Sequence, residues 1–171
     1  MFRFLLAAAV SVALTACGGT SGVGAVGSSH ASHGREPVEL ELRTPDNVLV
    51  NVGDFRGQTM LLFLFATFDG VSQAALHPLA RFTRHHPEVY VLGIAVQPTP
   101  KELLDAWKAA LDPPFVVTYS PEDRLTSGTS ELGAVGAIPT FIVLDAKGYE
   151  VTRESGMVSE ARLEALVAEA Q

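Results

Sequence analysis

The sequence predicts an α/β domain in which a central sheet is flanked by helices. Its clearest segment runs from Leu61 to Phe65, a continuous apolar stretch typical of a strand buried on both faces. After Asp69 and Gly70 the apolar residues take helical spacing, so this strand is expected to lead directly into a helix. Strand-like and helix-like stretches alternate from there to the end of the sequence, which predicts helices on both faces of the sheet.

Residues 1–16 have the pattern of a secretory signal, because one arginine precedes an apolar stretch shorter than the roughly 20 residues that span a bilayer. The signal ends in Leu14-Thr-Ala-Cys17, which resembles the lipobox of bacterial lipoproteins. That resemblance implies a lipid on Cys17 and a domain anchored in the cell envelope, facing the periplasm or the exterior. In a host with two membranes, Gly18 resembles sorting to the outer membrane. The alternative is an ordinary signal peptide that leaves Cys17 as a free thiol, and in both cases the domain is exported.

Residues 17–36 are rich in glycine and serine and are expected to form a flexible tether, with the folded domain at residues 37–171. His30 and His33 could contact a metal ion, but two histidines in such a tether are more simply polar residues. No metal site is therefore predicted.

The folded domain is expected to begin with a β-hairpin. Residues 38–42 alternate apolar and acidic side chains, as a half-buried strand does. Residues 44–47, Thr-Pro-Asp-Asn, predict a turn, and residues 48–52 return as the second strand.

The helix after the central strand is expected to run from Val71 to about His86, because Pro87 cannot continue it. His77, His85 and His86 belong to this helix, the last two at its C-terminal end, where the dipole favours cations. Residues 89–96 predict another buried strand.

A second helix is expected to begin at Pro100, with Thr99 as its N-cap and Glu102 completing a capping box. Two prolines at 113–114 end it. Its apolar face is expected to comprise Leu103, Leu104, Trp107 and Leu111.

The C-terminal part contains the remaining elements. Strands are predicted at 115–118, 140–144 and 150–153, and a short helix at 125–132. Phe63 and Phe141 are expected to pack on neighbouring strands. The terminal helix is expected to be capped by Ser159 and to face inward through Leu163, Leu166 and Val167.

Two segments of this domain resemble the thioredoxin-like TlpA/ResA family of membrane-tethered thiol–disulfide oxidoreductases. Phe65-Ala-Thr-Phe-Asp-Gly-Val-Ser72 resembles the family's Trp-Ala-Thr-Trp-Cys-x-x-Cys site, with Asp69 and Ser72 at the cysteine positions. Residues 135–148 resemble the second family signature, V-x-G-x-P-T-x-F-x-I-D-x-x-G. The resemblance covers roughly residues 38–171 and implies a thioredoxin-like fold with a central mixed sheet and an N-terminal β-hairpin.

The resemblance also implies a cis peptide bond between Ile138 and Pro139, in a loop that lies against the former cysteine site and helps to hold an extended substrate backbone. The expected groove comprises the residues of both segments that face it, which are Phe68, Asp69, Gly70, Val71, Ser72, Ile138, Pro139 and Thr140.

The chemistry of the family requires a thiolate at a helix N-terminus and a second cysteine that resolves the mixed disulfide. Asp69 and Ser72 can do neither, and the one cysteine of the chain is Cys17. No catalytic residue is therefore predicted. Both residues suit a helix cap, and three interpretations remain open: Asp69 and Ser72 only cap the helix, Asp69 offers a fixed negative charge to a partner, or Asp69 acts as a base.

These observations predict a redox-inactive, membrane-anchored protein that binds a peptide or an envelope protein through the former active-site groove. The alternative is a thiol–disulfide oxidoreductase or antioxidant role that takes its cysteines from another chain. A third possibility is an accessory that only supports an assembly.

Composition narrows the classes of partner. Apolar residues make up 47 % of the chain, which allows a well-packed core, and the net charge is −7. Without a basic cluster, nucleic acid is not expected as a partner. The sequence has no phosphate-binding loop, dinucleotide fingerprint or zinc motif, so no cofactor or metal is predicted.

Overall fold

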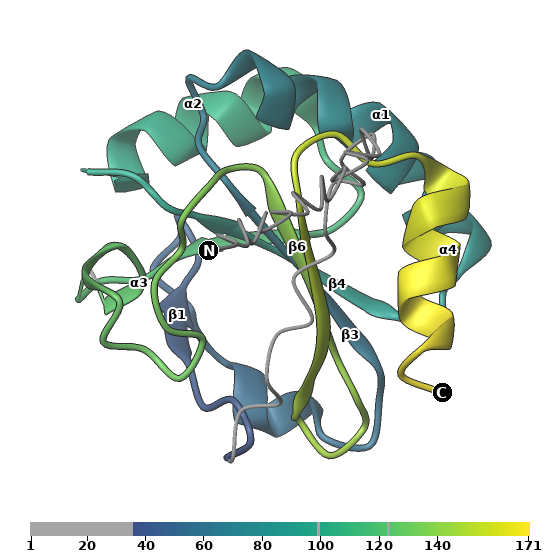
Figure 1. Cartoon of the computed structure of the whole chain (residues 1–171). Coiled ribbons are helices and arrows are strands. Elements are labelled where there is room, and N and C mark those ends of the chain that lie inside the picture. Colours follow the sequence, from purple (N-terminus) through teal and green to yellow (C-terminus); the bar gives the residue numbers. More distant parts are fainter. Residues whose placement is uncertain (1–35, 99, 123) are drawn as a thin grey trace, which may run out of the picture.

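A computed structural model describes residues 36–98, 100–122 and 124–171 of the chain (Figure 1). The predicted signal and tether, together with Cys17, His30 and His33, lie outside the described residues. The expected cap residue Thr99 also lies outside them, although the helix that follows it does begin at Pro100 as predicted. Among the described residues, no helix is both long and apolar enough to cross a membrane.

The domain is built on one mixed sheet of seven strands. The strands are β1 (Glu41–Arg43), β2 (Leu49–Asn51), β3 (Met60–Phe65), β4 (Tyr90–Ala95), β5 (Val116–Tyr119), β6 (Thr140–Leu144) and β7 (Glu150–Ser155). Their order across the sheet is β2-β1-β5-β4-β3-β6-β7, with β3, β4 and β5 parallel to one another. The other neighbouring pairs are antiparallel, and β1 and β2 form the predicted hairpin.

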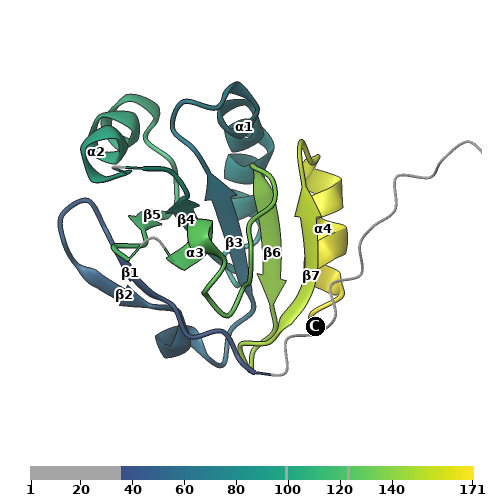
Figure 2. The same cartoon turned by 60° about the vertical axis from the view of Figure 1, so that its left-hand side comes forward.

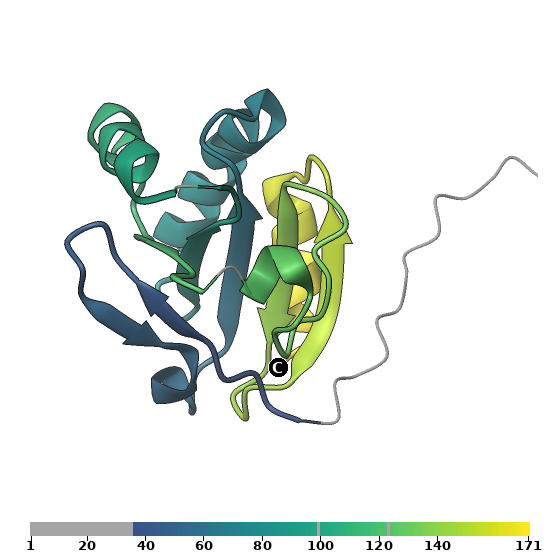
Figure 3. The same ribbon diagram turned by 90° about the vertical axis from the view of Figure 1, so that its left-hand side faces the viewer.

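Helices cover both faces of this sheet, as predicted. They are the 3-10 helix η1 (Val52–Phe55) and the α-helices α1 (Gly70–His85), α2 (Pro100–Leu111), α3 (Arg124–Ser127) and α4 (Glu160–Ala168). The helices α1, α2 and α4 pack on one face, while the short helix α3 packs on the other (Figures 2 and 3). The thioredoxin-like α/β fold expected from the sequence is therefore confirmed.

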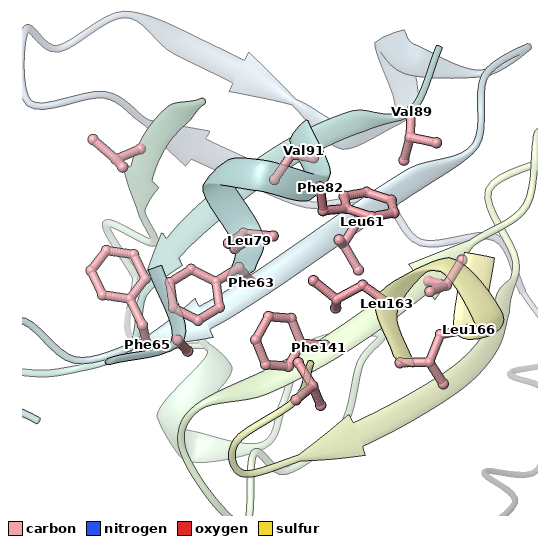
Figure 4. Close-up of a cluster of buried hydrophobic side chains, with 14 of the residues drawn as sticks. Leu61, Phe63, Phe65, Leu79, Phe82, Val89, Val91, Phe141, Leu163 and Leu166 are labelled. Carbon is pink, nitrogen blue, oxygen red and sulfur yellow. The ribbon is translucent and has the colours of Figure 1, made fainter. Parts of the chain in front are cut away.

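Strand β3 is the centre of the core because all six of its residues are buried. Alternate residues supply the two faces, so Phe63 belongs to the face covered by α1, α2 and α4, where Figure 4 shows its ring between those of Phe65 and Phe141. Its ring stacks on those of Phe65 and Phe141 at centroid distances of 5.1 Å, and Phe115 meets its edge at 6.1 Å. Because Phe63 and Phe141 are register partners on β3 and β6, the predicted packing of these two rings is confirmed.

Two expectations about helices are wrong. Helix α3 ends at Ser127 rather than at residue 132, because Gly128 takes a left-handed conformation and the next two backbone N–H groups both turn back to the Arg124 carbonyl. The apolar face expected for α2 is only half buried: Leu104 and Trp107 pack inward, while Leu103 and Leu111 remain 48 % and 43 % exposed. The helix packs on β5, and only the side of it that carries Leu104 and Trp107 joins the core, where Trp107 stacks on Phe65.

Three strand boundaries also differ from expectation. Strand β1 is shorter than residues 38–42, since Val38 bonds instead to the Gly148 carbonyl and the Leu40 carbonyl accepts from Val52. Residues 52–55 form η1 where the second hairpin strand was expected to end. Strand β7 continues to Ser155 because it stays paired with β6 along its length.

Ion pairs fasten the C-terminal end of α1 to α4. Glu160 accepts hydrogen bonds from Arg81 at 2.7 Å and pairs with His85 at 2.6 Å. His86 is the C-cap of α1, as its position at the helix end predicted, and its ring lies 3.1 Å from Glu88 and 3.3 Å from Glu164. Burial lowers the pKa of His86, but these two carboxylates outweigh burial and hold that pKa above the ordinary histidine value.

The aromatic centre of the core gives the first prediction. Replacing Phe63 by alanine removes a fully buried ring from contact with three others, and we expect it to lower the free energy of unfolding by about 3–5 kcal/mol. Phe68→Ala is the matched control, because that ring is 70 % exposed, and we expect a change within about 0.5 kcal/mol. Urea denaturation followed by tryptophan fluorescence measures both. Equal losses in the two variants would contradict this account of the core.

The pairs of His86 give a prediction about pH. A histidine whose pKa is higher in the folded state stabilises the fold at pH values below its unfolded pKa, and this contribution is lost as the pH rises through the folded pKa. We therefore expect the difference in free energy of unfolding between the wild type and His86→Gln to shrink as the pH rises above about 6.5, the ordinary histidine value. A difference that stays constant across this range would show that the ring acts only through its stacking on Phe82.

Candidate functional site

Three loops meet at one end of the central strands. The register pairs Leu64 near the end of β3 with Thr140 at the start of β6, and Thr140 with Ser155 at the end of β7. Residues 66–69, 137–139 and 156–158 therefore all lie at this end of the sheet (Figure 2). We call these three segments the loop end.

Asp69 is the N-cap of α1, as its position before the helix predicted. Its Oδ2 accepts hydrogen bonds from the backbone N–H and from the hydroxyl of Ser72, both at 2.7 Å. The Ser72 hydroxyl and N–H, with the backbone N–H of Val71, outweigh burial and hold the pKa of Asp69 below its ordinary value. At the two positions that resemble the family's cysteines, the Asp69 carboxylate and the Ser72 hydroxyl are thus hydrogen-bonded to each other at the start of the helix.

The second loop contains the expected cis peptide bond between Ile138 and Pro139. Its geometry is fixed from both sides: the Thr140 hydroxyl donates to the Ala137 carbonyl at 2.7 Å, and the backbone N–H of Gly156 donates to the Pro139 carbonyl at 2.8 Å. This last bond joins the second loop to the third, so that residues 156–158 belong to the same surface.

The predicted groove residues divide by exposure. Phe68, Gly70 and Val71 are exposed, and Asp69 and Ile138 are half-buried. The other three are buried, so they support the loops rather than offer side chains to a partner, namely Ser72, Pro139 and Thr140.

Exposed apolar side chains lie on the loop end and on the adjoining first turn of α1. Phe68 is 70 % exposed, and Val71 on the first turn of α1 is 45 % exposed. Met157, directly after the glycine that bonds to Pro139, is 55 % exposed. Large apolar side chains exposed together at one end of a domain are typical of a contact surface for a partner.

Two sets of residues at this end were not predicted. Met157 carries no sequence signal beyond its place between a strand and a helix cap. Gln97 and Gln73 hold the backbone of Thr67 through their side chains, at 2.6 Å and 3.0 Å. A glutamine after a buried strand is typical of a surface loop, so its burial could not be inferred from the sequence.

The three histidines that the structure describes do not contribute to this end. His85 and His86 lie at the other end of α1, and His77 is exposed in the middle of the helix. In the part of the chain that the structure describes, no group of three or more histidine, cysteine, aspartate or glutamate residues is placed to hold a metal ion.

Comparison with known proteins identifies the fold. No family model matches the sequence, and no curated protein matches it either. Among solved structures, the exposed lipoprotein thioredoxin of Streptococcus pneumoniae is similar with a TM-score of 0.66 and 19 % identity, over 77 % of this chain and 98 % of that one. A secreted Mycobacterium tuberculosis disulfide oxidoreductase homologous to Escherichia coli DsbE gives 0.63 and 17 %, over 75 % and 94 %.

StoA from Bacillus subtilis is similar to the same degree, with a TM-score of 0.63 and 16 % identity over 77 % of this chain and 97 % of that one. At these identities the likeness establishes a thioredoxin-like fold. The function has to be argued from the residues of the loop end.

The cap geometry predicts how Asp69 contributes to stability. A carboxylate whose pKa is lowered in the folded state stabilises the fold above its unfolded pKa, and loses that contribution as the pH falls through the folded pKa. We expect Asp69→Ala to lower the free energy of unfolding at neutral pH, with a deficit that shrinks below about pH 4.

Asp69→Asn is the matched control for this prediction, since its amide oxygen still accepts from the helix but carries no charge. It should destabilise less than Asp69→Ala at neutral pH. Denaturation curves at several pH values measure both variants. A deficit of Asp69→Ala that is the same at acid and neutral pH would contradict the cap geometry.

Proposed function

We propose that this chain is an exported, lipid-anchored protein of thioredoxin-like fold that has no thiol–disulfide activity and binds an extended segment of a peptide or envelope protein at the loop end. The observation that carries the proposal is that two features occur together at the loop end. Oxygen-bearing side chains stand at both positions that resemble the family's cysteines, and apolar side chains at the same end of the sheet stay exposed.

The chemistry of sulfur supports the first half of the proposal. Disulfide exchange proceeds by attack of a thiolate through a mixed disulfide, and neither a carboxylate nor a hydroxyl forms that intermediate. Asp69 and Ser72 stand where the two thiols are needed, and the described residues contain no cysteine. A thiol-dependent peroxidase needs the same nucleophile, so it is disfavoured on the same ground.

The arrangement of the loop end supports the second half. Phe68, Val71 and Met157 offer exposed apolar area, and Ile138 adds a half-buried side chain beside them. Burial of apolar surface is the main driving force of most association, and aromatic residues and methionine are enriched at interfaces. The charge of Asp69 is largely engaged by the helix, so an uncharged, apolar segment fits this surface better than a basic one.

The lipobox-like Leu14-Thr-Ala-Cys17 supports the proposed location in the cell envelope, with the outer membrane as the site in a host with two membranes. The similar structures named above include an exposed lipoprotein and a secreted protein, which agrees with export.

The proposal predicts binding of an unfolded, thiol-free chain. The probe is fluorescein-labelled α-lactalbumin that has been reduced and blocked at its cysteines with iodoacetamide, which adds no charge, and the protein is the chain from Cys17 onward with Cys17→Ser. Fluorescence anisotropy gives the Kd. We expect Phe68→Ser combined with Met157→Ser to weaken binding about tenfold or more, because two apolar contacts are lost.

Leu111→Ser combined with Val116→Ser is the matched control, since these exposed side chains, at 43 % and 38 %, lie at the end of α2 and the start of β5, at the opposite end of the sheet. The control should bind as the wild type does. Equal binding by both double variants would place the contact on another surface, and absence of binding by the wild type would overturn the proposal for extended apolar chains.

A further inference from the structure

Just past the paired ends of β3 and β4, the side chain of Gln97 makes one further hydrogen bond between the two segments. Strands β3 and β4 pair in parallel as far as Phe65 and Ala95, and the last backbone bond runs from the Val96 N–H to the Phe65 carbonyl at 2.8 Å. The next N–H along, that of Thr67, donates to Oε1 of Gln97 at 2.6 Å instead of to a backbone carbonyl. The amide of Gln97 thus takes the place of one further step of the ladder.

The other side of the same residue is held by helix α1. The Thr67 carbonyl accepts a hydrogen bond from Nε2 of Gln73 at 3.0 Å. Both peptide groups of Thr67 are therefore fixed by glutamine side chains, one after β4 and one on the first turn of α1. Phe68 follows immediately, and Asp69 after it, so the direction in which these two residues leave the sheet depends on Thr67.

The burial of Gln97 indicates that its oxygen matters. Its side chain belongs to a residue that is 5 % exposed, and its Nε2 has no hydrogen-bond partner among the residues the structure describes. Burying an unpaired N–H is unfavourable, and an apolar side chain of similar size would avoid it. The bond from the Thr67 N–H to Oε1 is what a glutamine at this position provides.

We infer that Gln97 is a positioning residue of the loop end: its amide oxygen fixes Thr67 and thereby sets the placement of Phe68 and Asp69 for binding. The claim that Gln97 affects binding rests on the proposed function. The claim that Gln97 fixes Thr67 does not depend on a ligand. Gln97 acts through Thr67 and is not proposed to touch the bound segment.

Three variants separate this role from a general effect on stability. Gln97→Leu keeps the size of the side chain and removes the acceptor. Gln97→Glu keeps an acceptor oxygen at the same distance along the side chain. Thr118→Val is the matched control, because it removes another buried bond from a side chain to the backbone, from the Thr118 hydroxyl to the Gly93 carbonyl at 2.9 Å, without touching residues 66–69.

Two measurements need no ligand and use the chain from Cys17 onward with Cys17→Ser. We expect the Thr67 amide to exchange its hydrogen about tenfold faster or more in Gln97→Leu, and to remain protected in Gln97→Glu and Thr118→Val. By NMR titration, the pKa of Asp69 should rise toward its ordinary value in Gln97→Leu alone, because the cap on Ser72 loosens when the loop shifts. An unchanged Thr67 amide and Asp69 pKa in Gln97→Leu would overturn the inference.

The third measurement is the Kd for the labelled α-lactalbumin blocked with iodoacetamide. We expect Gln97→Leu to weaken binding about fivefold or more, and Gln97→Glu and Thr118→Val to bind within about twofold of the wild type. If Thr118→Val weakens binding equally, or if Gln97→Leu moves the loop without changing the Kd, Gln97 does not position the binding surface. If the wild type fails to bind, the proposed function fails, and the exchange and titration results still decide whether Gln97 holds the loop.

Discussion

The constraint on which this domain depends is the complete burial of β3. A strand with six buried residues, paired on both edges, must be covered on both faces and has no contact with water along its length. The helices α1, α2 and α4 cover one face, and residues 38–42, η1 and α3 cover the other. Because the strand is fixed in this way, the chain leaves it at a defined point, beside the start of β6 and the end of β7. The register of β3, β6 and β7 therefore determines which three loops meet at the loop end.

At the loop end, the start of α1 needs a group that accepts hydrogen bonds and carries negative charge. The first N–H groups of a helix have no partner within the helix, and the positive end of its dipole favours a negative charge. In a thiol-dependent redox protein a thiolate can take this position. Here it is taken by the carboxylate of Asp69, which accepts two hydrogen bonds from Ser72. The pair of Asp69 and Ser72 stabilises the helix start electrostatically and offers no sulfur nucleophile.

The features predicted from the sequence are those that depend on neighbouring residues or on a motif, and the features that were missed depend on contacts between distant segments. The core strand, the helix that Asp69 caps, the Phe63–Phe141 contact and the Ile138–Pro139 loop each depend on neighbours in the sequence or on a motif, and all were predicted. The exposure of Leu103 and Leu111 was not, because it depends on how far α2 reaches over the sheet. Gln97 was missed for a similar reason: its bond to Thr67 joins segments 30 residues apart, and no local pattern marks it.

The described residues contain no cysteine, and this limits the kind of binding that the loop end, as proposed, can support. Without a mixed disulfide, affinity depends on noncovalent contacts, chiefly apolar ones here, and fully burying a side chain such as Phe68 contributes about 1.5–3 kcal/mol. Ordering an extended segment and losing its free motion cost several kcal/mol in return, so a surface of three or four such side chains supports weak, rapidly reversible complexes. Such contacts become effective when both partners are held near each other, since tethering converts a bimolecular encounter into one governed by a high local concentration. A lipid on Cys17, as proposed, would supply that condition at a membrane surface, and a weak binding site and an anchor are therefore physically complementary features of the same chain.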